Sequence, residues 1–149
     1  MDVTLVPGAA DEVFRTRFEA SFVHGMDETL ERLGLSRDML ERQMSEVGEI
    51  RTVEVDGNAA GSVWTELRGR TLHLHALLLD EAYRGRGIGA CVLSLLENEI
   101  AGRADELELG VEDANIRARR LYEKAGFYEV ESLPGVGFRI LRKRLPASG

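Results

Sequence analysis

The chain has 149 residues, of which 44% are hydrophobic and 30% charged, and its formal net charge is −7. This length and composition are typical of one globular domain with its own core, so we expect residues 1–149 to form a single domain. An acidic chain is repelled by phosphate backbones, which argues against nucleic acid as a partner. No apolar run approaches the ~20 residues that a bilayer requires, and the first residues lack the pattern of a signal peptide.

Cysteine usage points to the compartment. Cys91 is the single cysteine, and an internal disulfide needs two. No group of histidines and cysteines has the spacing of metal ligands, so no metal site is predicted. Together with the missing signal peptide, this predicts a cytoplasmic location. The sequence leaves the oligomeric state open, a homodimer included.

The first half of the chain predicts a strand, two helices and a three-stranded meander. The strand covers residues 3–6. Asp11 and Ser36 belong to the residue types that cap helices, and an apolar stripe follows each of them. Residues 24–35, between these helices, are predicted to be irregular or weakly helical. Alternating apolar runs separated by turn residues then predict antiparallel strands at 50–55, 59–67 and 72–79.

The second half returns to helices and strands in alternation. Gly87 opens a helix whose apolar residues repeat at helical spacing: Ile88, Val92, Leu95, Leu96 and Ile100. A strand at 107–111 follows, and then a helix that is capped by Asp113 or Asn115 and ends at Gly126. Two last strands are predicted at 127–133 and 137–145. The order is strand, two helices, three strands, helix, strand, helix and two strands, which is a mixed α/β fold.

Residues 83–90 read Tyr-Arg-Gly-Arg-Gly-Ile-Gly-Ala and stand between a strongly apolar strand and an amphipathic helix. A helix N-terminus offers unpaired N–H groups and about half a positive charge. Glycines let a bulky anion approach the backbone, and Arg84 and Arg86 add formal charge beside these amides. This pattern predicts a cradle for a phosphate or pyrophosphate.

Two nucleotide-binding alternatives share part of this pattern. A P-loop is excluded because no Gly-Lys-Ser/Thr follows the glycines. Residues 85–90 do fit the dinucleotide fingerprint G-x-G-x-x-G/A, and Glu106 lies about 20 residues on, where a ribose-binding acid would stand. Against an NAD-binding module, the polar residues 80–84 separate the strand from the glycines, and the remaining chain is too short for two βαβαβ halves.

Two motifs resemble those of the GNAT superfamily of N-acetyltransferases. Residues 84–89, Arg-Gly-Arg-Gly-Ile-Gly, match its Gln/Arg-x-x-Gly-x-Gly/Ala signature at every specified position. Residues 115–127, Asn-Ile-Arg-Ala-Arg-Arg-Leu-Tyr-Glu-Lys-Ala-Gly-Phe, resemble its N-x-x-A-x-x-L-Y-x-x-x-G-F block. Glu81 departs from the family, which often has a proline there. With the strands around them, the motifs cover residues 71 to 130. The resemblance implies a GNAT-like fold in which the strand at 72–79 splays from the one at 107–111.

The same resemblance implies acetyl-CoA, or a close acyl-CoA relative, as the cofactor. Its pyrophosphate would lie on the amides of residues 86–90 beside Arg84. The pantetheine arm would pair with the backbone at Leu77 and Leu79 and form a hydrogen bond with Asn115. Arg119, or its neighbours Arg117 and Arg120, would reach the 3′-phosphate. The predicted cofactor-binding set is therefore Leu77, Leu79, Arg84, Arg86, Gly87, Ile88, Gly89, Ala90, Asn115 and Arg119.

Amine acylation needs a neutral amine and a proton for the departing thiolate, and the resemblance implies direct attack through a tetrahedral intermediate. Tyr122 is the candidate acid, since it stands at the tyrosine of the second motif. His73 and His75 are candidate bases because they lie two residues apart on the strand that leads to the cofactor site, and we expect them to share a face with Leu77 and Leu79. Glu66 is a third candidate, and a chain of waters a fourth.

The sequence predicts an N-acyltransferase that acts on a small-molecule or protein amine, and it does not identify the acceptor. By the resemblance, Trp64 and residues 24–35 would line the acceptor pocket. An acyl-CoA-binding sensor of the same fold, without turnover, is the main alternative function. A Rossmann-like dinucleotide-binding module is the third hypothesis.

Overall fold

The computed structural model describes residues 1–146, so the last three residues of the predicted domain lie outside the described residues. A seven-stranded sheet runs through it in the order β1-β2-β3-β4-β5-β7-β6. Within residues 1–146, β4 and β5 pair in parallel and the other neighbours pair antiparallel. The strands are β1 (Val3–Pro7), β2 (Glu49–Val55), β3 (Asn58–Arg68), β4 (Thr71–Leu79), β5 (Glu106–Glu112), β6 (Tyr128–Leu133) and β7 (Phe138–Arg144).

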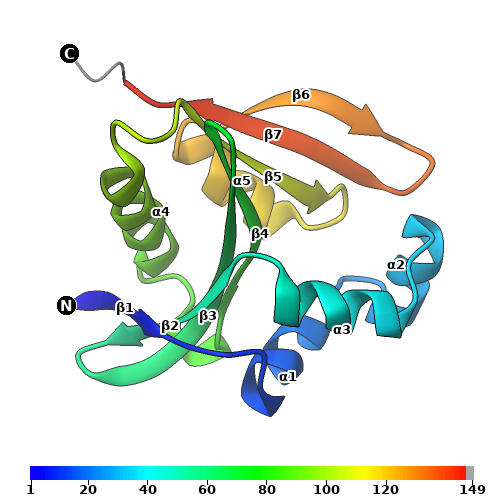
Figure 1. Cartoon of the computed structure of the whole chain (residues 1–149), viewed down its shortest axis with the longest axis horizontal. Coiled ribbons are helices and arrows are strands. Elements are labelled where there is room, and N and C mark those ends of the chain that lie inside the picture. The colour runs from blue at the N-terminus through cyan, green and yellow to red at the C-terminus, as the bar shows by residue number, and fades with distance from the viewer. Residues whose placement is uncertain (147–149) are drawn as a thin grey trace.

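Helices cover both faces of this sheet (Figure 1). On one face lie α1 (Glu12–Ala20), α2 (Met26–Leu33) and α3 (Arg37–Glu46). On the other lie α4 (Ile88–Ile100) and α5 (Ile116–Lys124), and a short 3-10 turn, η1 (Glu81–Tyr83), connects β4 to the glycines before α4. Among residues 1–146, no helix has both the length and the apolar character needed to cross a membrane.

Each face has its own buried cluster. Under α4 and α5, side chains such as Val92, Leu96, Leu107 and Leu109 are at most 1% exposed. Under α1–α3, the cluster is aromatic: Phe14 and Phe18 pack edge-on against Trp64, with ring centroids 6.1 Å apart in both pairs. The sheet therefore separates an aliphatic half of the core from an aromatic half.

The mixed α/β fold predicted from the sequence is confirmed. Two predicted helix caps are confirmed: Asp11 accepts from the Phe14 amide at 2.9 Å, and Ser36 accepts from the Met39 amide at 3.1 Å. Asn115, rather than Asp113, caps α5 by accepting from the Ala118 amide at 3.2 Å.

One segment is more regular than predicted. Residues 24–35 were expected to be irregular or weakly helical, but most of them form α2. Met26 and Leu30 are buried one turn apart, and Gly34 closes the helix in the left-handed conformation, with φ 69°. Gly25 gives this helix no side-chain cap, so tertiary packing on the aromatic cluster, rather than local sequence, explains its regularity.

Candidate functional site

The central strands β4 and β5 separate halfway along their length. Their parallel pairing begins at Thr71↔Glu106 and ends at Leu74↔Leu109, although β4 continues to Leu79. From there β5 follows β7 as far as Glu112, and β4 follows β3. The edge of β4 beyond Leu74 is thus free of a β5 partner, as the splayed pair implied by the resemblance requires.

Two cavities meet at this separation. The larger, about 620 Å³, is lined by the end of β4, by Arg84 and by α5. The smaller, about 240 Å³, is lined by α1–α3 and by the diverging parts of β4 and β5. Both are lined by Ser21, Phe22, Leu77, Leu78, Asn115, Ala118 and Tyr122. A molecule that extended from one cavity to the other would pass Tyr122.

Tyr122 belongs to α5 but lies at the junction of the two cavities. Its side chain is 7% exposed and packs against Phe127, with ring centroids 5.5 Å apart. Burial raises the pKa of the Tyr122 phenol above its ordinary value of 10. The phenol is protonated at neutral pH even without this effect, and the raised pKa favours hydrogen-bond donation to a thiolate over full proton transfer.

A β-bulge in β4 sets which way the candidate bases point. Trp64 of β3 pairs with Ala76, but the next residue, Thr65, pairs with Leu74, so His75 is an extra residue in β4. Before the bulge, Leu74 packs in the cluster under α4; after it, Ala76 packs in the cluster under α1–α3. The bulge thus reverses the alternation of the strand.

Because of this bulge, one prediction from the sequence is wrong. Strict alternation predicted that His73 and His75 share a face with Leu77 and Leu79. Instead, Leu77 and Leu79 pack on the aliphatic cluster under α4 and α5. His75 stacks on Trp64, which belongs to the opposite, aromatic cluster, and His73 lies against His75 with ring centroids 4.6 Å apart.

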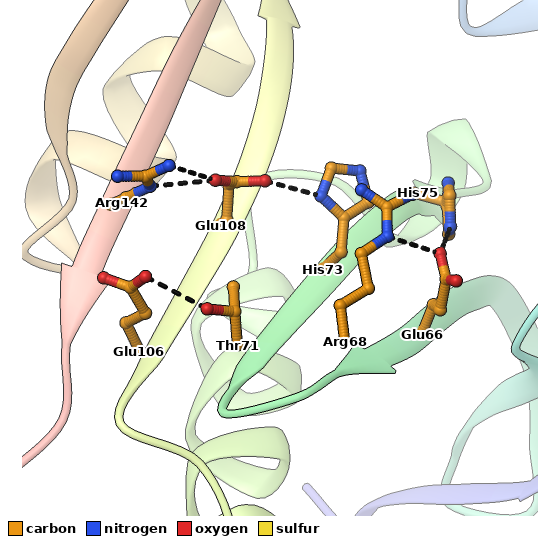
Figure 2. A network of polar contacts seen from close by, with 8 residues as sticks. All are labelled: Glu66, Arg68, Thr71, His73, His75, Glu106, Glu108 and Arg142. Carbon is orange, nitrogen blue, oxygen red and sulfur yellow. Dashed lines mark hydrogen bonds and ion pairs between the residues drawn. The ribbon is translucent and has the colours of Figure 1, made fainter.

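Both histidines belong to a polar network that crosses the sheet (Figure 2). A ring nitrogen of His75, Nε2, lies 2.9 Å from Glu66 of β3, which also accepts from Arg68 at 2.7 Å. Nδ1 of His73 lies 3.1 Å from Glu108 of β5, whose other oxygen accepts from Arg142 of β7 at 2.8 Å. Each imidazole is thereby oriented by a carboxylate.

Burial and charge set the protonation of this network. Burial lowers the pKa of His75 below 6.5; the hydrogen bond to Glu66 opposes this effect, and the charge of His73 adds to it. Burial raises the pKa of Glu66, but hydrogen bonds from His75 and Arg68 outweigh it, so the pKa lies below 4.5. Near neutral pH the pair is therefore a neutral imidazole and a carboxylate. Such a carboxylate accepts the Nε2 hydrogen and leaves Nδ1 of His75 free to take a proton.

Of the three candidate bases, His75 is the one that lines the smaller cavity together with Tyr122. His73 and Glu66 line neither this cavity nor the larger one. Glu66 is within hydrogen-bond distance of His75, and the ring of His73 packs against that of His75.

The glycine-rich turn has the geometry expected of an anion cradle. Gly85 and Gly87 have φ of 76° and 79°, and a Cβ built on either would meet no atom within 4 Å. The N-cap of α4, Gly87, supplies no side-chain hydrogen bond, so the amides of Ile88, Gly89 and Ala90 keep no intrahelical acceptor. Gly85, Gly87 and Ala90 are exposed, whereas Ile88 and Gly89 are buried.

Four of the other predicted cofactor residues line the larger cavity, and two, Arg86 and Arg119, do not. Leu77, Leu79, Arg84 and Asn115 line it. Gly89 has a packing role, because a Cβ there would stand 2.9 Å from a methyl of Leu121. Arg84 donates to the Leu79 carbonyl at 3.1 Å, and the guanidinium of Arg86 stands 5.5 Å from the centroid of the Tyr83 ring.

Arg119 and Arg117 differ in where they point. Arg119 donates to the Asp113 carbonyl at 3.1 Å and does not line the larger cavity, whereas Arg117 does line it. The role predicted for Arg119 at the 3′-phosphate stays a prediction, and Arg117 is the arginine of that group that lies at the cavity.

Two residues of the site were missed by sequence reasoning. Arg17 of α1 lines the larger cavity and binds both oxygens of Asp80, at 2.9 and 3.0 Å, and the Gly61 carbonyl at 3.2 Å. Glu112 lines the smaller cavity at the end of β5. The alternation of β5 could have predicted the direction of Glu112. Leu107, Leu109 and Val111 occupy one face of the strand, so Glu112 belongs to the other. No sequence signal indicated Arg17.

Known proteins resemble the chain in sequence and in fold. Residues 11–127 match the family described as acetyltransferase (GNAT) family. A mycothiol acetyltransferase of Kineococcus radiotolerans is 29% identical over 122 residues, which are 82% of this chain and 40% of that protein. An uncharacterized N-acetyltransferase of Methanocaldococcus jannaschii is 31% identical over 54% of this chain and 53% of its own length. The chain thus spans about half, or less, of these curated relatives.

Solved structures share the fold. The ribosomal-protein-S18-alanine N-acetyltransferase of Escherichia coli superposes with a TM-score of 0.71 at 19% identity, over 99% of this chain and 97% of that one. The PaiA N-acetyltransferase of Thermoplasma acidophilum, solved in complex with coenzyme A, gives 0.71 at 19% identity, over 97% and 99% of the two chains. Three observations agree on one family: the match over most of the chain, the separation of β4 from β5, and the glycine-rich turn. The chain belongs to the acetyltransferase (GNAT) family.

Proposed function

We propose that this chain transfers an acetyl group from acetyl-CoA to a primary amine, with residues 1–149 acting as one acyltransferase domain. The observation that carries the proposal is the position of Tyr122. It lies where a cavity that reaches Arg84 and the end of β4 meets a second cavity lined by His75. A cytoplasmic location stays a prediction from the sequence.

The residues of the larger cavity fit coenzyme A. The amides and positive φ values after Arg84 suit a pyrophosphate, because glycine leaves the backbone accessible and the helix N-terminus is electropositive. The free edge of β4 at Leu77 suits an amide-bearing arm that would add to the sheet as a strand does. Arg117 also lines this cavity and supplies a cation there.

When bound, acetyl-CoA supplies the acyl carbon, which gains a bond to the amine nitrogen and loses its bond to sulfur. In this proposal His75 takes the proton that the amine gives up, which is supported by its ring lining the smaller cavity and by the contact of Nε2, not Nδ1, with Glu66. Tyr122 is placed to donate a hydrogen bond, and transiently a proton, to the departing thiolate. Trp64 and Glu66 hold the imidazole between a stacked ring and a carboxylate.

A single assay tests the proposal. Purified protein is mixed with acetyl-CoA and each member of a panel of primary amines, and the release of free thiol is followed. Amine-dependent release is expected, with the acetylated amine formed in equal amount. Tight binding of acetyl-CoA without release for any amine would favour the sensor instead.

A further inference from the structure

The smaller cavity contains an acidic side chain, Glu112, in largely apolar surroundings. It is lined mainly by apolar and aromatic side chains, which include Phe18, Phe22, Leu30, Leu33, Leu35, Leu40, Trp64 and Phe138. Glu112 lies among them and is 9% exposed. No arginine or lysine is found among the described residues that line this cavity.

Glu112 has little compensation from the protein itself. Its Oε1 accepts from the Val23 amide at 3.2 Å, and no ion pair with Glu112 occurs within residues 1–146. His24 and Arg32 line a small neighbouring cavity with Glu112, but Arg32 pairs with Glu28 at 2.9 Å. Arg139 pairs with Asp113 at 2.8 Å. A buried carboxylate without a cationic partner is costly, so an external cation would relieve the cost.

We propose that Glu112 selects the acceptor: a primary amine on an apolar or aromatic body that carries no carboxylate. This inference rests on the proposed acetyl transfer for the role of the cavity as acceptor site. An alkylamine arrives protonated, because its pKa is about 10. Glu112 then receives the ammonium group while the aromatic and leucine side chains receive the body.

The same charge excludes free amino acids. Their α-carboxylate would enter a cavity that offers it Glu112 and no arginine or lysine. Proteins that recognise a carboxylate in a dry site usually place such a cation there. The predicted acceptor class therefore narrows from any small amine to amines without a neighbouring carboxylate.

Trp64 allows a test that does not depend on turnover. It is the single tryptophan of the chain and lines the smaller cavity, so its fluorescence reports occupancy of this cavity. The full chain is titrated with phenethylamine, L-phenylalaninamide and L-phenylalanine. The last two have nearly the same shape and differ in the charge of the carboxyl group. Phenylalanine is expected to bind roughly tenfold or more weakly than the amide.

The substitution Glu112→Gln keeps the shape of the side chain and an oxygen that can accept from the Val23 amide. It is expected to weaken the binding of both carboxylate-free probes roughly tenfold. The difference in affinity between phenylalanine and its amide should also become smaller. Glu123→Gln, on the exposed side of α5, is the matched control and should bind all three probes as the unmodified chain does.

Equal affinity for phenylalanine and its amide in the unmodified chain would overturn the inference, whatever the variant does. So would probe affinities that Glu112→Gln leaves unchanged in a protein with an unaltered melting curve. Release of thiol from acetyl-CoA is scored separately. Probes that bind in the predicted order without any release would leave the selectivity of Glu112 standing, and the wider panel of primary amines would then decide the proposed acetyl transfer.

Discussion

The imidazole of His75 stacks on the indole of Trp64, with ring centroids 4.3 Å apart and planes inclined by 22°. Trp64 is itself fixed, because its indole nitrogen donates to the Val47 carbonyl at 2.8 Å. The β-bulge in β4 is what brings the two rings together, since it adds His75 to the strand opposite Trp64 and Thr65. The aromatic core under α1–α3 thus positions the candidate base.

Replacing Tyr122 by phenylalanine should slow turnover roughly 100-fold or more, because a general acid contributes about that much to such reactions. The affinity for acetyl-CoA, measured by calorimetry, should stay within about twofold, since the ring still packs on Phe127. Tyr128→Phe, at an exposed position of β6, is the control and should have the unmodified rate. An unchanged rate in the Tyr122 variant would remove this hydroxyl from the mechanism.

The pH dependence of kcat/KM should identify the base. His75 accepts a proton only when neutral, so activity should fall as the pH decreases through its pKa, which burial places below 6.5. In His73→Gln the nearby charge that lowers this pKa is lost, so the acid limb should move to higher pH. In Glu66→Gln a hydrogen bond that raises it is weakened, so the limb should move to lower pH. Identical profiles for all three proteins would assign the proton to another group.

Stability should fall as the solution is acidified. Burial lowers the pKa of both His73 and His75, so below 6.5 the unfolded chain binds protons that the folded chain does not. Glu66 and Glu108, whose pKa values lie below 4.5, add a further loss at lower pH for the same reason. Chemical denaturation of the His73→Gln/His75→Gln double variant should show a flatter dependence just below pH 6.5 than the unmodified chain. A steeper dependence would contradict the protonation states assigned here.

The cradle is tested at Gly87. A valine there meets no neighbouring atom but must adopt a φ of 79°, so Gly87→Val should cost about 1 kcal/mol and cover the amides that await the anion. Gly102→Val is the matched control, because Gly102 has a φ of 82° and is equally free of neighbours. Both variants should melt at similar temperatures, while Gly87→Val alone loses its thermal stabilisation by acetyl-CoA. Equal stabilisation of both would refute the cradle.

A close approach of strands β3 and β4 predicts a larger effect on folding. A Cβ at Gly61 would clash with the carbonyl oxygen of Leu78, which belongs to the backbone and cannot move alone. Gly61→Ala should therefore destabilise the protein by about 2 kcal/mol or more. Gly135→Ala, in an open turn without neighbours, should change the unfolding free energy little. An unchanged free energy of unfolding in Gly61→Ala would mean that β3 and β4 can move apart at this point without cost.

Local chemistry made much of the fold predictable. Asp11, Ser36 and Asn115 act through bonds to residues three positions away, and the strands of the meander are separated by short turns. What the sequence could not show depends on distant contacts. The bulge at His75 is specified by pairing with β3, and α2 is stabilised by packing on the aromatic cluster. Arg17 contacts Asp80, 63 residues away, so no local pattern could place it at the cavity.

Acetyl transfer itself is best tested by mixing the unmodified chain with acetyl-CoA and phenethylamine and measuring free thiol and N-acetylphenethylamine together. The position of Tyr122 between the two cavities predicts that both products appear in equal amounts, at a rate that rises with enzyme concentration. The proposed acetyl transfer would be contradicted by a folded protein that acetyl-CoA stabilises against heat but that forms neither product. This result would have to hold for phenethylamine and for every other primary amine.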